Sequence, residues 1–524
     1  MKRKVRKVKQ SNSLRSYFIL LLLLILPVFA VALGQRSMWQ SDAQAVVNLY
    51  VSPTGSDSNT GTSASSALKT IQSALNKASP GTTINIAPGI YREKLTTVVN
   101  GTADSPIILK GSEVGKEKST RYKTVLYGTG RIVNIDHSYY RLEGFTIDGQ
   151  EKLSTTTYPT DLNSIRSFKD SVQSNVADGR LIYIGSAETS KDITGVVITN
   201  MFLHGAGGEC VRMRNNAVNN TISDSVIEWC GMYGKGDDTE QYKYHNGEGV
   251  YIGTSPKSTD QPMAGNDQSS NNIIRDSTIN TFGSECFQVK ENAHDNSFIN
   301  NICAFNDEPT EFLGSAIELR GHNNSLVGNT ISQSKSVAFK MKSDSTQYDK
   351  GGNSAQNNTF SDYVGAGILN DQTSPQGIFC GNTFSTSTIV QGNSVGNPTE
   401  PCVDNPTLPA NGVPPATQPP VVVTDEPLLT PTLFCLGTEC GAPSGAPTNP
   451  VEPTTVELPL TSGPTEPQAS EEPYATTEVT QSPSQTPGNT DNNNNGDPKN
   501  TGGLLGFLLL LFQLILEFFR NIFK

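Results

Sequence analysis

The central part of the chain alternates apolar and polar residues over short segments that recur along the sequence. Between Glu285 and Ser325 two such segments stand out, FQVK from Phe287 and IELR from Ile317. Successive side chains of a β-strand point to opposite faces, so the apolar residues of each segment share one face and the polar residues share the other. The pattern predicts short strands, each with one buried face.

Each strand is followed by a corner motif in which two apolar residues stand five positions apart. An asparagine two positions before the first apolar residue occurs in six motifs, at Asn220, Asn272, Asn296, Asn324, Asn358 and Asn382. Stacked asparagines can hydrogen-bond from coil to coil and satisfy backbone groups at a bend. Eight motifs in one phase predict an all-β parallel solenoid over most of residues 130–390. The apolar pairs are Leu142/Ile147, Ile198/Leu203, Ile222/Ile227, Ile274/Ile279, Phe298/Cys303, Leu326/Ile331, Phe360/Gly365 and Phe384/Ile389.

Residues 46–95 predict a cap for one end of the solenoid. A helix is indicated by apolar residues at helical spacing, with Ser65 or Ser66 as its N-cap and Pro80-Gly81 as its end: Leu68, Ile71, Leu75 and Ala78. Asp57 and Asn59 favour a hydrogen-bonded turn over a metal loop. The stretch resembles the N-terminal cap of secreted right-handed parallel β-helix proteins of the pectate-lyase-like superfamily. That resemblance implies a right-handed parallel β-helix over residues 46–402. The predicted α-helix would cover the open apolar end of this solenoid.

The N-terminal segment is typical of an export signal. Residues 1–16 hold seven Lys and Arg and no acid, and an apolar run from Tyr17 to Gly34 follows. Residues 1–34 therefore predict a signal peptide, cleaved after Ala30-Val31-Ala32, or an uncleaved signal anchor. In both cases the rest of the protein is expected to be exported.

The C-terminal part predicts a spacer and a hydrophobic helix. Residues 403–502 are rich in Pro, Thr, Ser, Glu and Asn, a composition that predicts a disordered linker. Residues 503–524 contain the apolar run Leu504–Phe519, followed by Arg520 and Lys524. This run predicts a membrane anchor, either as a marginal transmembrane helix that oligomerises or as a helix lying in the membrane plane.

The overall charge argues against nucleic acid as a partner. The formal net charge is −11, and removal of the seven cations of the N-terminal segment takes it to about −18. The eight cysteines give no obvious framework. Cys380 and Cys402 could close the C-terminal end of the solenoid, and Cys435 and Cys440 could close a small loop in the linker.

Six strands of the solenoid align into columns with a charged outer face. Their inward pairs are Ile182/Ile184, Val211/Met213, Val250/Ile252, Phe287/Val289, Ile317/Leu319 and Phe339/Met341. The outward position within each pair holds, in order, Tyr183, Arg212, Tyr251, Gln288, Glu318 and Lys340. The next outward position holds Gly185, Arg214, Gly253, Lys290, Arg320 and Lys342. At the strand entrance, three consecutive strands carry Glu209, Glu248 and Glu285.

Two interpretations of these columns remain open. The charges could neutralise each other on a solvated face. Alternatively they form a groove for an acidic sugar chain, walled by the loops 231–246 and 255–270, because like charges on neighbouring strands cost stability unless a ligand offsets them. The substrate-binding candidates are then Arg212, Arg214, Tyr251, Lys340 and Lys342, and the metal-ligand candidates are Glu285, Glu248 and Glu209. The histidines show no metal-ligand spacing, and His204 and His245 are expected in loops near this face.

The segment E285-x-x-x-x-K290, followed one coil later by G-x-A-I-E-L-R320-G-H-N, resembles the chondroitinase B and alginate lyase family of β-helix lyases. The resemblance implies that Lys290 is the catalytic base, Arg320 its partner and Glu285 a ligand of Ca²⁺. The family's second acid falls here on Gly283, so calcium would need Glu248 from the neighbouring coil. Folding is expected to survive substitution of Lys290 or Arg320, because both side chains point outward.

The sequence thus favours a cell-surface or secreted protein that binds an acidic, uronate-containing polysaccharide. As a polysaccharide lyase, it would cleave this polysaccharide by β-elimination. Removing the proton beside a carboxylate requires that the carboxylate be neutralised, which Arg320 or a cation would do. The alternative is a non-catalytic carbohydrate-binding, adhesin or surface-structural β-helix protein.

Overall fold

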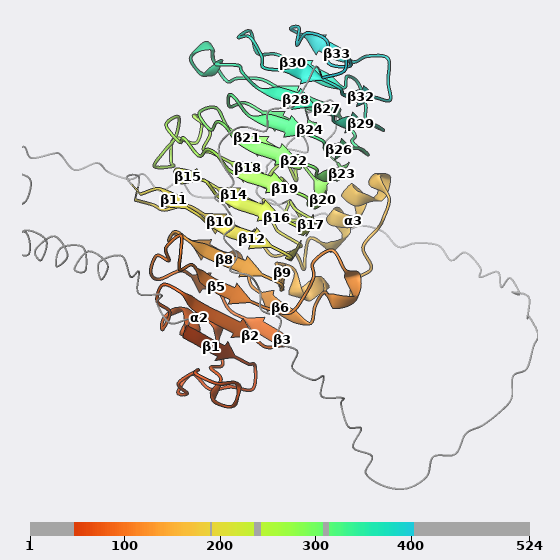
Figure 1. Cartoon of the computed structure of the whole chain (residues 1–524). Coiled ribbons are helices and arrows are strands. Elements are labelled where there is room, and N and C mark those ends of the chain that lie inside the picture. Colours follow the sequence, from red (N-terminus) through yellow and green to blue (C-terminus); the bar gives the residue numbers. More distant parts are fainter. Residues whose placement is uncertain (1–46, 189–190, 235–242, 308–313, 403–524) are drawn as a thin grey trace, which may run out of the picture. The chain divides into compact units, whose positions relative to one another are not determined.

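The computed structural model describes residues 47–188, 191–234, 243–307 and 314–402, and three long parallel sheets run through them. The predicted signal segment, linker and C-terminal anchor lie outside the described residues. Each coil of the chain contributes one short strand to each sheet, and every strand pairs in parallel with its counterpart on the next coil (Figure 1). The protein is a right-handed parallel β-helix, as predicted. Within the described residues no helix is long and apolar enough to cross a membrane.

The strands of the three sheets have the following bounds. The first sheet contains β1 (Val47–Val51), β2 (Thr82–Ile86), β5 (Ile107–Lys110), β8 (Tyr140–Glu143), β12 (Val197–Thr199), β16 (Thr221–Ser223), β19 (Ile273–Arg275), β22 (Ser297–Ile299), β25 (Ser325–Val327), β28 (Ser354–Gln356) and β31 (Phe379–Cys380). The second contains β3 (Gly89–Arg92), β6 (Thr124–Tyr127), β9 (Thr146–Asp148), β13 (Phe202–His204), β17 (Val226–Glu228), β20 (Thr278–Gly283), β23 (Ile302–Asn306), β26 (Thr330–Ile331), β29 (Thr359–Phe360) and β32 (Thr383–Phe384). The third contains β4 (Leu95–Thr96), β7 (Gly130–Ile135), β10 (Gly179–Ile184), β14 (Val211–Met213), β18 (Val250–Ile252), β21 (Phe287–Val289), β24 (Ser315–Leu319), β27 (Val337–Met341), β30 (Ile368–Asn370) and β33 (Val390–Gly392).

Few elements lie outside these sheets. A small pair, β11 (Ile193–Thr194) and β15 (Ala217–Val218), joins two neighbouring coils. Within the described part of the chain the α-helices are α2 (Ile71–Leu75) and α3 (Ile165–Val172). Short 3-10 turns occupy Ala64–Ser66, Lys118–Thr120, Glu151–Leu153, Leu162–Ser164 and Thr346–Tyr348.

The helix near the N-terminus is shorter than predicted. Helix α2 begins after Thr70, whose side chain accepts a hydrogen bond from the backbone N–H of Ser73, so neither Ser65 nor Ser66 is its cap. The carboxylate of Asp57 accepts the N–H groups of Lys69 and Thr70, both at 2.9 Å, and holds the preceding segment in a turn. Helix α2 lies at the N-terminal end of the solenoid (Figure 1). Its apolar side chains, together with Leu68, join the core.

The asparagines form two ladders rather than the single column predicted. The first precedes the first sheet and the second lies between the first and second sheets. Each side-chain Oδ1 accepts the backbone N–H and the Nδ2 of the asparagine on the preceding coil, for example Asn324 from Asn296, at 3.0 Å for both bonds. The ladders are Asn220–Asn272–Asn296–Asn324–Asn353 and Asn301–Asn329–Asn358–Asn382.

The last two predicted corner pairs, Phe360/Gly365 and Phe384/Ile389, were therefore assigned to the wrong sheet. Phe360 pairs with Ile331 and not with Leu326, whose partner on that coil is Ala355. The first and second sheets present apolar columns five residues apart, and each is preceded by an asparagine. A slip of five residues therefore produces a pattern that looks the same, and Asn358 and Asn382 fell into the wrong column.

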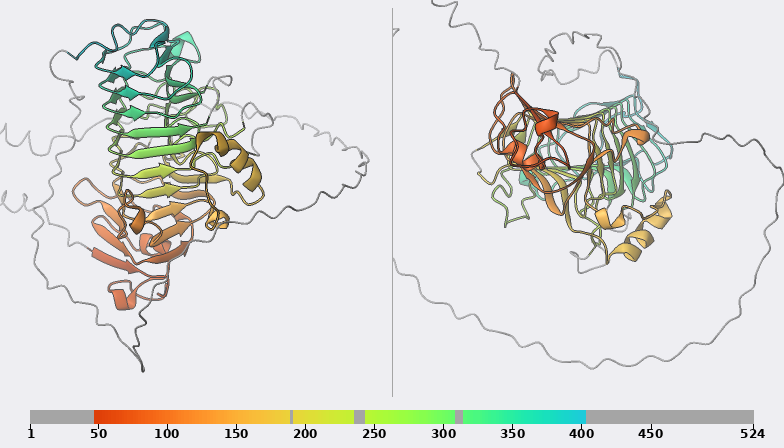
Figure 2. Two further views of the ribbon diagram at one scale, coloured as in Figure 1. Left: turned by 90° about the vertical axis from the view of Figure 1, so that its right-hand side faces the viewer. Right: turned by 90° about the horizontal axis from the view of Figure 1, so that it is seen from below.

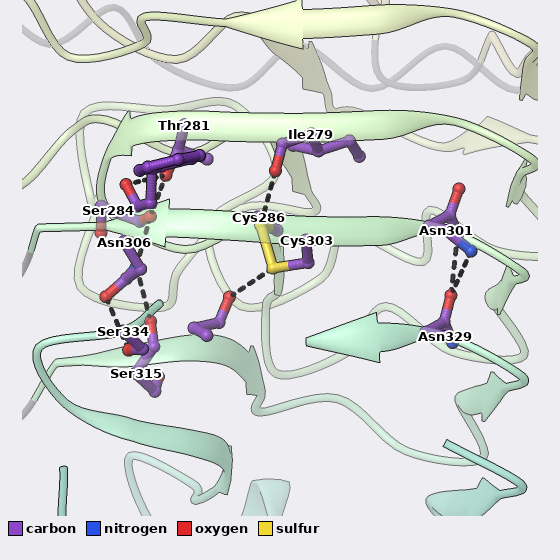
Figure 3. Close-up of a disulfide and its surroundings, with 12 residues drawn as sticks. Ile279, Thr281, Ser284, Cys286, Asn301, Cys303, Asn306, Ser315, Asn329 and Ser334 are labelled. Atoms are coloured by element: carbon purple, nitrogen blue, oxygen red, sulfur yellow. Dashed lines mark hydrogen bonds between the residues drawn. A yellow bond between two sulfur atoms is a disulfide. The ribbon is translucent and has the colours of Figure 1, made fainter. Parts of the chain in front are cut away.

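Three disulfides close loops of the solenoid: Cys210–Cys230, Cys286–Cys303 and Cys380–Cys402. The last was predicted as a closure of the C-terminal end. Cys286, which directly precedes β21 of the third sheet, is bonded to Cys303 of β23 in the second sheet, two positions after Asn301 of the second asparagine ladder (Figure 3). Cys435 and Cys440 lie outside the described residues.

Candidate functional site

The predicted columns lie side by side on the outer face of the third sheet, and we call this group of side chains the charged row. Tyr251 pairs with Arg212 on one side and with Gln288 on the other, and Glu318 pairs with Gln288 and with Lys340. The same pairing sets Lys290 beside Arg320, one strand spacing (~4.8 Å) away. The charged row contains Glu209, Arg212, Arg214, Glu248, Tyr251, Glu285, Gln288, Lys290, Glu318, Arg320, Lys340 and Lys342.

Most of the charged row is buried, although its side chains face away from the solenoid core. Glu209, Glu248 and Glu285 are at most 2% exposed, and Lys340 is 2% exposed. The solvated face that one interpretation assumed is therefore not what these residues form. Burying charges is costly unless they are paired, so the contacts of each group decide what it can do.

Glu318 lies at the centre of the positive end of the charged row. Its carboxylate contacts Arg320 at 2.5 Å, Lys340 at 3.1 Å and Lys342 at 3.6 Å. It also accepts a hydrogen bond of 3.2 Å from Gln288. Burial acts to raise the pKa of Glu318, but Arg320 and the two lysines outweigh burial and hold that pKa well below its usual range. Glu318 is thus a permanent anion that neutralises cations on two coils.

Arg320 is held by two further carboxylates that the columns had not included. Its Nη1 lies 2.7 Å from Asp344 and 3.3 Å from Glu291. Burial would lower the pKa of Arg320, yet Glu318 and these acids together raise it. Both residues could have been found, because Glu291 directly follows Lys290 and Asp344 stands two positions after Lys342. The predicted columns did not include Glu291 and Asp344, because the columns were limited to the strands.

The loop 255–270 reaches the charged row, as expected of a wall. Lys257 forms an ion pair of 2.9 Å with Asp344. The side chain of Asp267 in the same loop accepts the backbone N–H groups of Asn215 and Asn216, which directly follow Arg214. Only parts of the other predicted wall, 231–246, belong to the described residues.

The carboxylates of Glu209 and Glu285 are held mainly by other side chains of the protein. Glu209 contacts Arg212 and Arg180, a residue that the columns had not included. Glu285 accepts from Ser284 and, at 3.4 Å, from Gln288. Ca²⁺ takes six to eight oxygen ligands, and within the described residues no three His, Cys, Asp or Glu side chains form a metal-binding group. As arranged, the three glutamates do not fit calcium, and calcium remains a prediction.

Glu248 differs from its two neighbours. It is 2% exposed, and its Oε2 has no hydrogen-bond partner among the described atoms. Burial, and after it the nearby Glu285, raises the pKa of Glu248 to about 7. A carboxyl group with such a pKa can donate or accept a proton near neutral pH.

Tyr251 is surrounded by three cations. The guanidinium carbons of Arg212 and Arg214 lie 4.6 and 5.1 Å from the ring centre, and Lys290 Nζ lies 5.0 Å from it. Arg214 also donates to the hydroxyl of Tyr251 at 3.3 Å. The Nε atoms of Arg212 and Arg214 are buried and have no partner among the described atoms. Two unpartnered donors beside a lysine make this part of the charged row suited to an anionic group.

Of the two histidines expected in loops near the charged row, His245 lies there and His204 does not. His204 is part of strand β13 in the second sheet, not of a loop near the charged row. Its Nδ1 lies 3.2 Å from Asp148. His245 does lie in a loop near the charged row, where its charge acts to lower the pKa of Glu248.

No family model matches the chain. Among curated proteins, the uncharacterized protein YwoF of Bacillus subtilis (strain 168) is 30% identical over 129 residues, which are 23% of this chain and 27% of that protein. The match therefore spans about a quarter of that relative. Similar solved structures include an alginate lyase from Paenibacillus sp. str. FPU-7, with 18% identity, 62% of this chain and 95% of that chain covered, and a TM-score of 0.47. Pectate lyase Pel9A has 13% identity, 66% and 78% coverage, and a TM-score of 0.40.

Proposed function

We propose that the charged row binds an acidic, uronate-containing polysaccharide and cleaves it by β-elimination. The observation that carries this proposal is the pair of buried, unpartnered Nε donors of Arg212 and Arg214 beside Lys290 and Tyr251. Buried donors without acceptors cost about 1–3 kcal/mol each, a cost that a bound carboxylate removes. Lys342, which is partly exposed, extends the positive surface toward the next sugar.

Lys290, in its neutral form, is the proposed base. It would take the proton from the carbon next to the sugar carboxylate, and the electron pair would form a double bond as the neighbouring glycosidic C–O bond breaks. The leaving oxygen needs a proton, and Glu248 is the proposed donor. Its pKa of about 7 keeps the carboxyl group protonated at lower pH. Lys290, which gains a proton, and Glu248, which loses one, return to their starting states by exchange with water.

Arg320 receives a different role from the one that the resemblance implied. Three protein carboxylates already share its guanidinium, which leaves little of its charge for a substrate. We assign it as a positioning residue that fixes Glu318 and the adjacent strand next to Lys290. The carboxylate clamp is assigned instead to Arg214 and to the Nε of Arg212, whose Nη2 already contacts Glu209.

The same protein is proposed to act outside the cell and to be tethered to its surface. This part rests on the sequence of residues 1–34 and 503–524. Deleting residues 503–524 should release the protein into the medium. A full-length protein that is already freely soluble outside the cell would contradict the tether.

A second candidate is a non-catalytic carbohydrate-binding protein. The pairing of Arg320 and Lys340 with Glu318 favours it, because much of the charged row is neutralised within the protein. An ultraviolet absorbance screen for unsaturated uronates on alginate, pectate and glycosaminoglycans separates the two candidates. A rise in absorbance supports the lyase, whereas binding without any rise on all these substrates supports the binder.

A further inference from the structure

A second concave region lies on the outer face of the second sheet, away from the charged row. It is a cavity of about 750 Å³ above β9, β13, β17 and β20, closed on one side by residues 154–160. This segment belongs to the insertion that carries α3, which stands against the outside of the solenoid (Figure 2). The volume falls in the range of about 300–1,000 Å³ typical of ligand sites. We call this region the aromatic cavity.

The floor of the aromatic cavity is a column of polar side chains. Strand pairing sets His204 between Asp148 and Glu228, and Asn280 follows Glu228. These four residues stand on successive coils, about 4.8 Å apart. Acceptors and donors therefore recur at regular intervals along the cavity.

The walls of the aromatic cavity are built from aromatic rings. Trp229 stacks on Phe282 with ring centres 4.2 Å apart, and Phe282 stacks on Phe305 at 4.7 Å. All three residues adopt positive φ, at 58°, 47° and 57°, a backbone conformation that is rare for bulky side chains and is concentrated at functional sites. The aromatic lining residues include Tyr122, Tyr158, Phe202, Trp229, Phe282 and Phe305.

Part of these aromatic rings simply packs the insertion onto the sheet. Trp229 is 3% exposed and contacts Phe168 of α3. Packing does not explain the polar atoms that remain. The hydroxyl of Tyr158 and the Oδ1 of Asn280 are buried and have no partner among the described atoms, and both residues line the cavity. Asp148, by contrast, is fixed by the hydroxyl of Tyr122 at 2.7 Å and by His204.

We propose that the aromatic cavity is a second carbohydrate site, and that its ligand is a neutral oligosaccharide. Flat aromatic faces suit the apolar faces of sugar rings, while the polar column and the two unpartnered atoms suit hydroxyl groups. Asp148 and Glu228 outnumber Lys118, the one Lys or Arg among the described lining residues, and would repel a uronate. The proposal is independent of the charged row, because the two sites lie on different sheets and share no residue.

The test uses the full-length chain with Trp39→Phe, so that Trp229 is the one remaining tryptophan. Its fluorescence is followed during titration with β-1,4-linked hexasaccharides of glucose, xylose and mannose, and separately with a hexauronate. At least one neutral hexasaccharide is expected to change the emission saturably below about 10 mM, and the hexauronate is not.

Two conservative variants and one control complete the test. Tyr158→Phe removes one hydroxyl and keeps the ring, whereas Glu228→Gln removes one charge. Each variant is expected to weaken binding of the neutral hexasaccharide about 3–10-fold. Lys290→Ala, in the charged row, should leave this binding unchanged. The proposal is overturned if no neutral hexasaccharide changes the emission, if the hexauronate does so instead, or if both variants bind like the parent. None of these outcomes bears on cleavage at the charged row.

Discussion

Arg320 donates from Nε to the carboxylate of Glu318 at 2.5 Å, and the side chains of both residues are largely buried. Glu318 belongs to β24 and Arg320 directly follows the end of that strand, two positions later, so the bond links the two outward columns of the charged row. A cation that the sequence suggested for a substrate carboxylate is thus committed to a protein carboxylate. This one bond changes what substitutions along the charged row should do.

Arg320→Ala should destabilise the fold and not only the reaction. The change leaves Glu318, Glu291 and Asp344 without a shared cation, and breaking a buried ion pair from one side typically costs about 3–5 kcal/mol. Denaturant unfolding measures the loss, with Lys110→Ala on an exposed part of the first sheet as the control, expected within about 0.5 kcal/mol of wild type. Equal stabilities for the two variants would show that Arg320 is free for substrate, as the sequence had suggested.

Asn329→Ala should weaken the second asparagine ladder. Asn329 accepts from Asn301 at 2.9 and 3.0 Å and donates to Phe298 and Asn358 at 2.8 and 3.0 Å. Removal leaves buried backbone groups unsatisfied and should lower the free energy of unfolding by at least about 2 kcal/mol.

The control for this ladder prediction is Asn163→Ala, a change at an exposed position in a 3-10 turn. It should stay close to wild type in the same unfolding experiment. If both substitutions cost the same, the ladder contributes no more than an ordinary surface residue does.

Replacing Cys286 and Cys303 together by alanine should lower the midpoint of thermal unfolding. Their disulfide links residues 17 positions apart, and a loop of about 15 residues corresponds to roughly 3 kcal/mol in the chain-entropy model. Thiol titration of the denatured protein without reductant should detect neither cysteine. Immediate reaction of either one would exclude the bond.

The stability of the protein should depend on pH through Lys169. This lysine is fully buried, and its Nζ donates to the backbone oxygen of Cys230 at 3.2 Å. Burial lowers the pKa of Lys169 to about 7. Between pH 7 and its ordinary pKa near 10.4 the unfolded state binds more protons, so stability from this group rises with pH across that window and is constant below it.

Lys169→Met tests this pH dependence. The variant should be more stable than wild type at pH 6, and the difference should shrink by roughly 1.4 kcal/mol per pH unit above pH 7. Denaturant unfolding at pH 6, 8 and 10 gives the comparison. A difference that does not change with pH would mean that Lys169 titrates as an exposed lysine does.

Much of the solenoid could be predicted because its two signals are local and repeated. Inward pairs such as Phe287/Val289 and Ile317/Leu319 alternate strictly, and the structure pairs them as aligned. Phe360 shows where such local signals become ambiguous. Two apolar columns at the same spacing cannot be told apart by phase alone, and the fifth member of the first ladder, Asn353, was missed for that reason.

The columns of the candidate site were also predictable, but their contacts were not. Strand alternation places Lys290 and Arg320 side by side, yet Glu291 and Asp344 follow strand ends, where alternation carries no information. Burial could not be predicted either, because it depends on loops such as 255–270 folding over the sheet. The aromatic cavity was missed because Tyr158 and Trp229 are 71 positions apart in the sequence and follow no common repeat.

The claim that the charged row is catalytic is tested most directly by the initial rate of double-bond formation at Lys290→Ala, on whichever polysaccharide the wild type cleaves. The comparison is with Lys110→Ala, which removes an exposed lysine far from the charged row. Loss of a general base should reduce kcat by about 10²–10⁴-fold at Lys290, while the Lys110 variant should match the wild type. If Lys290→Ala keeps most of the wild-type rate, the base is another residue and the proposed site is wrong.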